Sequence, residues 1–294
     1  MEVGFFGTHR NRLGESPVWD DRRQCLWWVD SLAGLIHAAA ADGTRIATFR
    51  MAQPVGSIGL AEHGLVAALA DGFYAIDADT GAAQPIALLP VDTTLRLNDG
   101  KADRDGRFLS GQMQVHGGGV TPSEASLWQL GEDCVQRLAG GLALTNGICF
   151  SPDGATLYYA DSLDGVIRAH AYDGATGSIG LRRDLVDCRA FGSGPDGVTV
   201  DADGNLWVAL VLAQAVACLA PDGRLLRTVA LPIPYPACPA FGGEGLATLY
   251  ITSIADSGGR LISDHPDAGR ILAITGLGVA GLAEGRYRHN HIRE

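Results

Sequence analysis

The sequence has no long apolar run and therefore no candidate for a membrane-spanning helix. No stretch approaches the roughly 20 consecutive apolar residues that a helix needs to cross a bilayer. Residues 1–15 also lack the hydrophobic core and cleavage site of a secretory signal. We therefore expect a cytoplasmic protein with no membrane partner.

Basic residues are few relative to acidic ones. The chain has 22 Lys and Arg residues against 33 Asp and Glu residues, and its formal net charge is −11. An acidic surface repels phosphate backbones, which argues against nucleic acid as a partner. The sequence leaves open whether the protein is a monomer or a small homo-oligomer.

Several familiar catalytic and redox motifs are absent as well. None of the six cysteines forms a CxxC pair and most lie inside apolar runs, so buried free thiols are expected rather than disulfides. The chain has no HExxH, no P-loop lysine and no GxSxG elbow. Serine-hydrolase chemistry and the common zinc sites are therefore disfavoured.

Glycine, in contrast, is abundant. The chain has 40 glycines, its Val, Leu and Ile residues come in short runs, and no amphipathic stretch is longer than about two helical turns. This pattern is typical of an all-β protein with many tight turns. No linker or break in composition divides the chain, so we predict a single domain over residues 1–294, with a frayed polar tail at about residues 285–294.

One hairpin-like unit recurs along the chain. In residues 194–210, two short apolar runs flank a polar turn at 201–204, as in a β-hairpin. Comparable turns fall near residues 20, 62, 103, 151, 201 and 242, at intervals of about 40 to 50 residues. This period predicts a six-bladed β-propeller with four antiparallel strands per blade. Residues 2–6 are the expected strand that closes the ring.

The units share one position at the start of their inner strands. In three of them an Asn or Asp lies eight residues before the turn glycine, and the same count reaches a residue in each other unit. The six positions are Glu15, Gly56, Asn98, Asn146, Asp196 and Ala237. Because the inner strand of each blade runs beside the central channel, we expect the four polar side chains to form a ring at one mouth.

Such a ring suits a divalent cation. Two carboxylates and two carboxamides make an oxygen-only ligand set that Ca²⁺ and Mg²⁺ prefer, and that Mn²⁺ or Zn²⁺ can also use. The alternative is that these are ordinary turn residues, since Asn-Gly and Asp-Gly are common hairpin signals. Turn chemistry does not explain the constant spacing, nor the presence of Glu15, which is a poor turn former.

Six short motifs carry a family resemblance that runs nearly from end to end. They are GESPVW at 14–19, RLNDGK at 96–101, TNG at 145–147, YYADS at 158–162, PDG at 195–197 and FGG at 241–243. In this order they resemble the senescence marker protein, gluconolactonase and luciferin-regenerating enzyme family. The resemblance implies a six-bladed propeller with one catalytic divalent metal in the channel, and hydrolysis of a sugar lactone.

The resemblance also implies roles for individual residues. Glu15, Asn146 and Asp196 would be the metal ligands, and Asp196 would also be the general base. Asn98 would touch metal-bound water or substrate, and Arg96 would bind the oxygens of the substrate. The ion is left open among Ca²⁺, Zn²⁺, Mg²⁺, Mn²⁺ and Fe²⁺. Where several animal members have acidic residues this chain has the sequence QVH at 114–116, so the sugar is left open as well.

The second strand of each unit returns to the same mouth, which adds further candidates. We expect Asp30 and Asp161 to support the site by hydrogen bonding, and Gln112, Gln114 and His116 to shape the substrate pocket. Two other functions stay open. One is metal-dependent hydrolysis of another ester, such as a bulkier lactone or a phosphotriester, and the other is a propeller that binds metal or protein without turnover.

Overall fold

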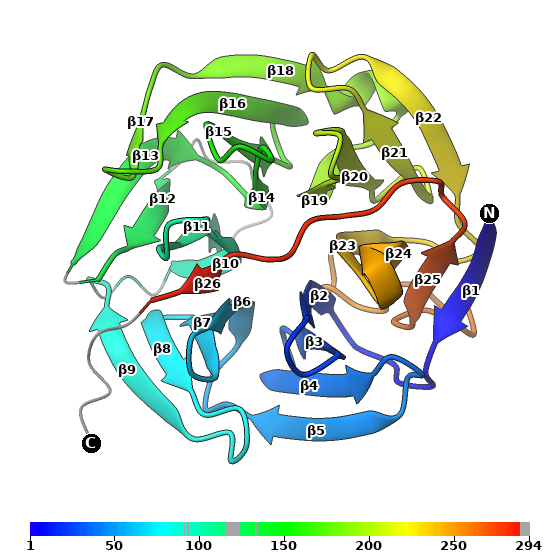
Figure 1. The fold of residues 1–294 in the computed structure, drawn as a ribbon, viewed down its shortest axis with the longest axis horizontal. Coiled ribbons are helices and arrows are strands. Elements are labelled where there is room, and N and C mark those ends of the chain that lie inside the picture. The colour runs from blue at the N-terminus through cyan, green and yellow to red at the C-terminus, as the bar shows by residue number, and fades with distance from the viewer. Residues whose placement is uncertain (91, 93, 116–123, 133, 289–294) are drawn as a thin grey trace.

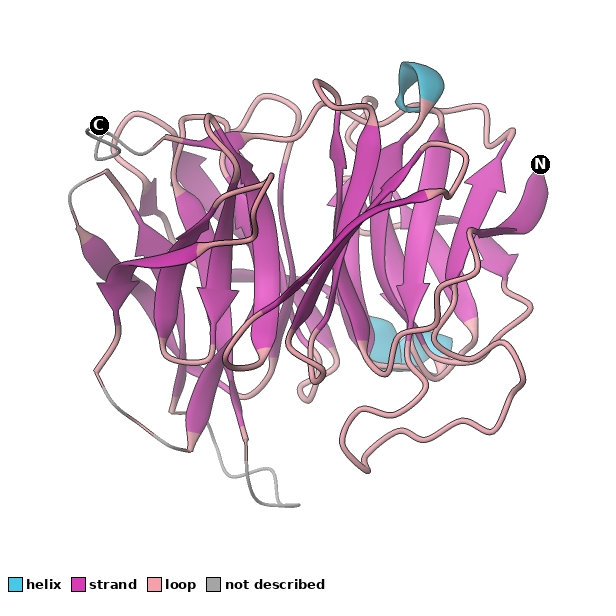
Figure 2. Ribbon diagram, turned by 90° about the horizontal axis from the view of Figure 1, so that it is seen from below, coloured by secondary structure: helices cyan, strands magenta, loops and turns pink. Residues whose placement is uncertain are grey.

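The computed structural model describes residues 1–90, 92, 94–115, 124–132 and 134–288. Six β-sheets are arranged around a central axis, and their strands span the thickness of a disc with loops on both faces (Figures 1 and 2). The prediction of an all-β, six-bladed propeller with four antiparallel strands per blade is therefore confirmed. In the described ranges the helices are two 3-10 turns, η1 (Cys188–Phe191) and η2 (Glu244–Leu246), and no helix there could cross a membrane.

The first three blades follow each other directly in the chain. Each runs from an inner strand beside the axis to an outer strand at the rim. Blade 1 contains β2 (Gly14–Asp20), β3 (Cys25–Asp30), β4 (Leu35–Ala40) and β5 (Arg45–Arg50). Blade 2 contains β6 (Val55–Ala61), β7 (Leu65–Leu69), β8 (Gly72–Ile76) and β9 (Ala83–Leu88). Blade 3 contains β10 (Leu95–Ala102), β11 (Phe108–Gln114), β12 (Ala125–Leu130) and β13 (Val135–Leu142).

The last three blades complete the ring. Blade 4 contains β14 (Thr145–Phe150), β15 (Thr156–Asp161), β16 (Val166–Asp173) and β18 (Arg183–Asp187), with the short β17 (Ser178–Ile179) paired to the end of β16. Blade 5 contains β19 (Pro195–Val200), β20 (Leu206–Leu210), β21 (Ala215–Leu219) and β22 (Leu225–Ala230). Blade 6 contains β23 (Pro236–Gly242), β24 (Thr248–Ser253), β25 (Ile271–Thr275) and β1 (Glu2–Phe6).

The N-terminal strand closes the ring as predicted. β1 pairs antiparallel with β25, so one blade contains the first and the last segments of the propeller (Figure 1). Phe6 then packs edge-on against Tyr250 of its own blade and Trp28 of blade 1, with ring centroids 4.9 and 6.4 Å apart. These contacts fasten the N-terminal strand to blades 6 and 1 through apolar burial as well as through backbone pairing.

The hydrophobic core lies between neighbouring blades. Side chains alternate between the two faces of a strand, and both faces of each sheet meet another blade, so inner strands are apolar on both sides. One cluster joins blades 1 and 2 through residues such as Trp27 and Ile58, and another joins blades 4 and 5 through residues such as Ile167 and Val208. All six cysteines are free thiols, and all except Cys134 are buried.

Each inner strand has a β-bulge at the same register. The pairing with the second strand shifts between Glu15 and Val18, Val55 and Ser57, Leu97 and Gly100, Asn146 and Cys149, Pro195 and Val198, and Pro236 and Pro239. A bulge bends the strand and re-aims a side chain. The six positions predicted from the repeat all fall at these bulges, which explains how one slot per blade can face the axis.

The other mouth of the channel is covered by the C-terminal segment. After β25 the chain crosses the centre of the ring (red in Figure 1), and β26 (Arg286–Tyr287) then pairs in parallel with β6. Tyr287 is buried, and the Arg286 guanidinium donates to the Asp20 carboxylate at 2.8 Å. Residues 285–288, which were expected to be frayed, are therefore ordered by pairing and burial, and residues 289–294 lie outside the described chain.

Candidate metal and substrate site

A cavity of about 270 Å³ lies at the mouth of the channel where the inner strands begin. Its lining includes the four polar residues of the repeat and the arginine near them, contributed by β2, β10, β14 and β19. These residues are Glu15, Arg96, Asn98, Asn146 and Asp196. The structure thus brings together side chains that are up to 181 positions apart in the sequence, between Glu15 and Asp196.

Hydrogen bonds fix the orientation of the two carboxamides. Asn98 Nδ2 donates to Asn146 Oδ1 at 2.7 Å, and Asn146 Nδ2 donates to Ser162 Oγ at 2.9 Å. Arg96 Nη1 in turn donates to Asn98 Oδ1 at 3.1 Å. A carbonyl oxygen has two lone pairs, so Asn146 Oδ1 keeps one for a further ligand.

The two carboxylates, in contrast, have no donor. In the described part of the chain no group donates a hydrogen bond to Glu15 or Asp196, and no cationic side chain lies within 4 Å of either. Burial raises the pKa of Glu15 well above its usual value, and the negative charge of Asp196 raises it further. Burial also raises the pKa of Asp196, and Asp99 adds to the shift. The two carboxylates therefore have no direct partner in the described chain, and Arg96 offsets the charge of Glu15 only in part.

This donor set fits a divalent cation. Two unpartnered carboxylates and one fixed amide oxygen are hard oxygen ligands, and a cation between them would offset the desolvation and repulsion that raise their pKa values. Nowhere in the described ranges do three or more His, Cys, Asp or Glu side chains gather in a metal-binding group. The candidate site therefore depends on the amide oxygen of Asn146.

Arg96 is the buried cation of the site. Its Nη1 atom donates to Leu97 O at 2.9 Å as well as to Asn98, and only 7% of the residue is exposed. Burial lowers the pKa of Arg96 to about 10, against the opposing effect of Glu15, so it stays protonated at neutral pH. No hydrogen bond from Nη2 or Nε reaches an acceptor in the described chain, which leaves these donors for a ligand.

Asp30 and Asp161 lie outside the cavity and hold the backbone beside it. Asp30 accepts from the backbone N–H groups of Arg12 and Leu13 at 2.7 and 3.1 Å. Asp161 accepts from the N–H groups of Ala143 and Leu144 at 3.0 and 3.2 Å. Each carboxylate thus links the end of a second strand to the segment that leads into the inner strand.

The structure does not place Gln112 or Gln114 in the cavity. Gln112 Oε1 accepts from the backbone N–H of Ser126 at 3.2 Å, and the β11 residue that lines the cavity is Met113. Side chains alternate along a strand, so the neighbours of Met113 point to the opposite face. The third residue expected to shape the pocket, His116, lies outside the described residues.

The cavity has features that the repeat did not reveal. A loop at residues 254–270, between β24 and β25, contributes Ser257, Arg260 and Leu261 to the lining. Much of the remaining wall is apolar, and it includes the exposed side chains of Leu163 and Leu212. The loop at residues 254–270 has no counterpart of similar length in blades 1, 2, 4 and 5, so the repeat gave no signal for it. Leu163 and Leu212 lie in the short turns after β15 and β20, which do recur between blades.

Comparison with known proteins places these features in a family. The sequence profile described as SMP-30/Gluconolactonase/LRE-like region matches residues 13–255. The chain is 35% identical over 281 residues to a 6-deoxy-6-sulfogluconolactonase of Pseudomonas putida, covering 92% of this chain and 94% of that protein. The fold is similar to that of a luciferin-regenerating enzyme, with a TM-score of 0.88, 29% identity and coverage of 98% and 99% of the two chains. A calcium-binding regucalcin of Agrobacterium tumefaciens gives a TM-score of 0.88 at 26% identity, with coverage of 97% and 96%.

Proposed function

Since the chain belongs to the SMP-30/gluconolactonase/LRE-like family, we propose that it hydrolyses a sugar lactone to the aldonic acid with the help of a divalent metal ion. The observation that carries the proposal is the cavity in which two unpartnered carboxylates, Glu15 and Asp196, lie with the guanidinium of Arg96. This set can bind a cation and a polar ligand side by side.

Glu15, Asn146 and Asp196 are the residues that would hold the ion. When bound, a divalent cation supplies a Lewis acid that polarises the lactone carbonyl and stabilises the oxyanion. The name of the regucalcin neighbour, a calcium-binding protein, favours Ca²⁺, while the oxygen donors also suit Mg²⁺, Mn²⁺, Zn²⁺ or Fe²⁺. Asn98 contributes by fixing the amide of Asn146 in one orientation.

The residues of the chain itself account for the proton transfers. Asp196 takes a proton from the water that attacks the carbonyl carbon, as a carboxylate base within the cavity can do. The ring C–O bond then breaks, and Asp196 returns the proton to the departing ring oxygen. Arg96 donates hydrogen bonds to the ring oxygen or a hydroxyl group, which positions the lactone for attack.

The substrate class rests on the relatives and on the cavity. The Pseudomonas putida relative is named for a six-carbon aldonolactone, and a cavity of about 270 Å³ is suited to one small ring. The apolar wall supports a second candidate, in which the same machinery opens a bulkier and more apolar lactone. Leu163 and Leu212 would then cover the substituent of that lactone.

A substrate panel with an Asp196→Asn variant tests this proposal. The wild-type protein should open gluconolactone, xylonolactone or galactonolactone faster than alkyl lactones, aryl esters or phosphotriesters. Asp196→Asn should lower kcat by at least about 100-fold, because it removes the proton acceptor. Asp222→Asn, which removes an exposed carboxylate on a turn of blade 5, should leave kcat unchanged. A near wild-type rate in Asp196→Asn would show that Asp196 is not the general base.

A further inference from the structure

Arg260 is a second cation of the cavity, and the proposed hydrolysis leaves it without a role. It lies in the loop between β24 and β25 and lines the same cavity as Glu15, Arg96 and Asp196. Arg96 is buried beside the carboxamides, whereas Arg260 is exposed. A ligand that reaches from the carboxylates toward solvent would therefore meet both guanidinium groups.

The loop that carries this arginine has a defined turn. The Ser257 N–H donates to Leu261 O at 2.9 Å, and the Leu261 N–H donates to Ser257 Oγ at 2.9 Å. Asp256 Oδ1 accepts from the N–H groups of Gly258 and Gly259 at 2.9 and 2.8 Å. Both glycines have positive φ angles, of 84° and 92°, which side chains with a Cβ rarely adopt. The turn therefore fixes the backbone from which the Arg260 side chain extends at the edge of the cavity.

The positive charge of Arg260 is not neutralised by the protein. In the described part of the chain no carboxylate lies within 4 Å of its guanidinium, and its hydrogen bond to Gln114 O is long, at 3.4 Å. Asp256 of the same loop already pairs with Arg12 at 2.7 Å. Burial is the main cause of the lowered pKa of Arg96, and repulsion from the like charge of Arg260 adds to it. An anion in the cavity would offset this repulsion.

We propose that the lactone carries an anionic substituent remote from its carbonyl group, and that Arg260 binds this group. The inference rests on the proposed lactonase function and deepens it. A carboxylate, a sulfonate and a phosphate each offer the oxygens that a guanidinium can grip with two parallel hydrogen bonds. Arg96 and the carboxylate site then act on the lactone ring, so the two arginines have separate tasks. Arg260 determines specificity and takes no part in bond breaking.

The experiment compares lactones that differ only at the position remote from the carbonyl. Gluconolactone is the neutral reference, and its analogues with a carboxylate, a sulfonate or a phosphate at carbon 6 are the three arms. Wild-type protein should show the highest kcat/KM for one of the anionic lactones, and the arm with the largest preference identifies the anion. The preference should come mainly from a lower KM and should shrink as salt is added.

Variants of Arg260 test whether this residue causes the preference for an anionic lactone. Arg260→Ala should reduce the ratio of kcat/KM for the anionic lactone to that for gluconolactone by about tenfold, which is typical for loss of a charge-assisted hydrogen bond. Arg260→Lys should restore part of this ratio. Arg22→Ala is the matched control, because it removes an exposed arginine that pairs with Glu62 away from the cavity, and it should leave the ratio unchanged.

The outcomes separate the two proposals. If wild-type protein opens gluconolactone but shows no preference for any anionic arm, or if Arg260→Ala leaves the ratio unchanged, the assignment of Arg260 is wrong and the lactonase function stands. If Arg22→Ala lowered the ratio of the two kcat/KM values as much as Arg260→Ala does, the preference would come from the overall charge of the protein. That result would also overturn the assignment. If the metal-loaded protein opens none of the lactones, the proposed function itself fails.

Discussion

At the residue scale, the candidate site depends on one position at the start of each inner strand, which is occupied by a different residue from blade to blade. Glu15 is followed by Ser16, whose φ angle of 48° is uncommon for a residue with a side chain. Ser16 Oγ donates to Ile58 O at 3.2 Å and accepts from Ile58 N–H at 2.9 Å, so the neighbouring inner strand holds this conformation. Such strain is typical of functional positions, and here it lies directly beside the candidate ligand Glu15.

The raised pKa values predict that metal binding depends on pH. The pKa of Asp196 is raised to about 8, so this carboxyl group is largely protonated at pH 7 in the metal-free site, and the pKa of Glu15 is raised as well. A cation binds the deprotonated carboxylates, so binding should release protons and affinity should increase as the pH rises toward 8. Isothermal titration at pH 7 in buffers of different ionisation enthalpy measures the number released.

Glu15→Gln serves as the control for that titration. It removes one ionisable ligand, and both the affinity and the number of released protons should fall. Heats that are the same in every buffer would show that the carboxylates are already ionised, which would contradict the predicted linkage.

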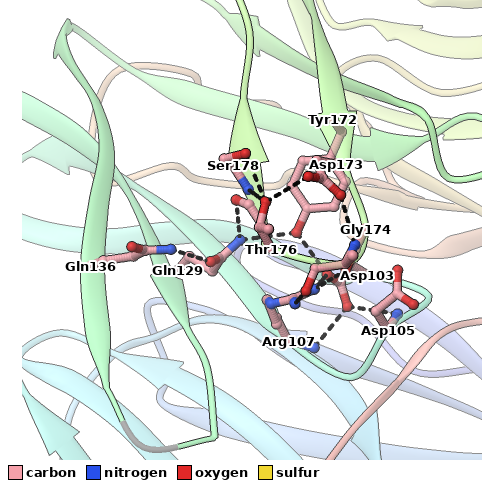
Figure 3. A network of polar contacts seen from close by, with 12 residues as sticks. Asp103, Asp105, Arg107, Gln129, Gln136, Tyr172, Asp173, Gly174, Thr176 and Ser178 are labelled. Carbon is pink, nitrogen blue, oxygen red and sulfur yellow. Dashed lines mark hydrogen bonds and ion pairs between the residues drawn. The ribbon is translucent and has the colours of Figure 1, made fainter.

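At the scale of elements, a buried polar network joins blades 3 and 4 beyond the end of β10 (Figure 3). The Asp103 carboxylate accepts from the Tyr172 hydroxyl at 2.7 Å and from Arg107 Nη1 at 3.0 Å. Gln129 Nε2 donates to the same hydroxyl at 2.9 Å, and Arg107 Nη1 also donates to Gly174 O at 2.7 Å. The β10–β11 turn, β12 and the end of β16 are thereby fixed around one buried carboxylate, which secures the contact between the two blades.

Removing the Tyr172 hydroxyl should destabilise the fold. In Tyr172→Phe the buried Asp103 loses a donor and Gln129 loses an acceptor, so the free energy of unfolding should fall by about 1 to 3 kcal/mol. Tyr74→Phe is the matched control, because the Tyr74 hydroxyl makes the same kind of bond, to Asp71 at 3.0 Å, near the surface. Its effect should stay below about 1 kcal/mol. If denaturant-induced unfolding gave the same loss of free energy for both variants, the buried network would contribute no more to stability than a hydrogen bond near the surface.

The repeat predicted the propeller and the ring because both follow from periodicity. A constant spacing placed Glu15, Asn98, Asn146 and Asp196 at one register, and the register is a property of the repeat. The faces of the second strands could not be predicted in the same way. A bulge shifts the pairing of each inner strand, so Met113 and not Gln112 or Gln114 faces the cavity. The loop at residues 254–270 has no counterpart of similar length in blades 1, 2, 4 and 5, and it gave no periodic signal.

At the scale of the whole molecule, the channel has one open mouth and one mouth crossed by the C-terminal segment. Glu284 of this segment accepts from Lys101 Nζ at 2.8 Å, and both side chains are largely buried. Burial alone would lower the pKa of Lys101, but the pairing with Glu284 outweighs it and the pKa is raised. The charge at the floor of the channel is thus balanced within the protein, in contrast to that of the cavity at the open mouth.

The C-terminal segment should contribute strongly to stability. Tyr287 is 1% exposed and packs in the cluster between blades 2 and 3, so Tyr287→Ala should lower the free energy of unfolding by about 3 kcal/mol or more. Arg288→Ala changes the next, exposed residue and should alter it by less than about 0.5 kcal/mol. If the denaturant midpoint of Tyr287→Ala equalled that of the wild-type protein, the C-terminal segment would contribute little to the stability of the fold.

The measurement that tests the account most directly is hydrolysis of gluconolactone by protein stripped with a chelator and then restored with single metal ions. Because Glu15, Asn146 and Asp196 are proposed to hold an ion that activates the lactone, stripped protein should add nothing to the spontaneous rate. Addition of Ca²⁺, Mg²⁺, Mn²⁺, Zn²⁺ or Fe²⁺ should restore acid release with at least one of these ions. A stripped protein that retains its full rate would contradict the account.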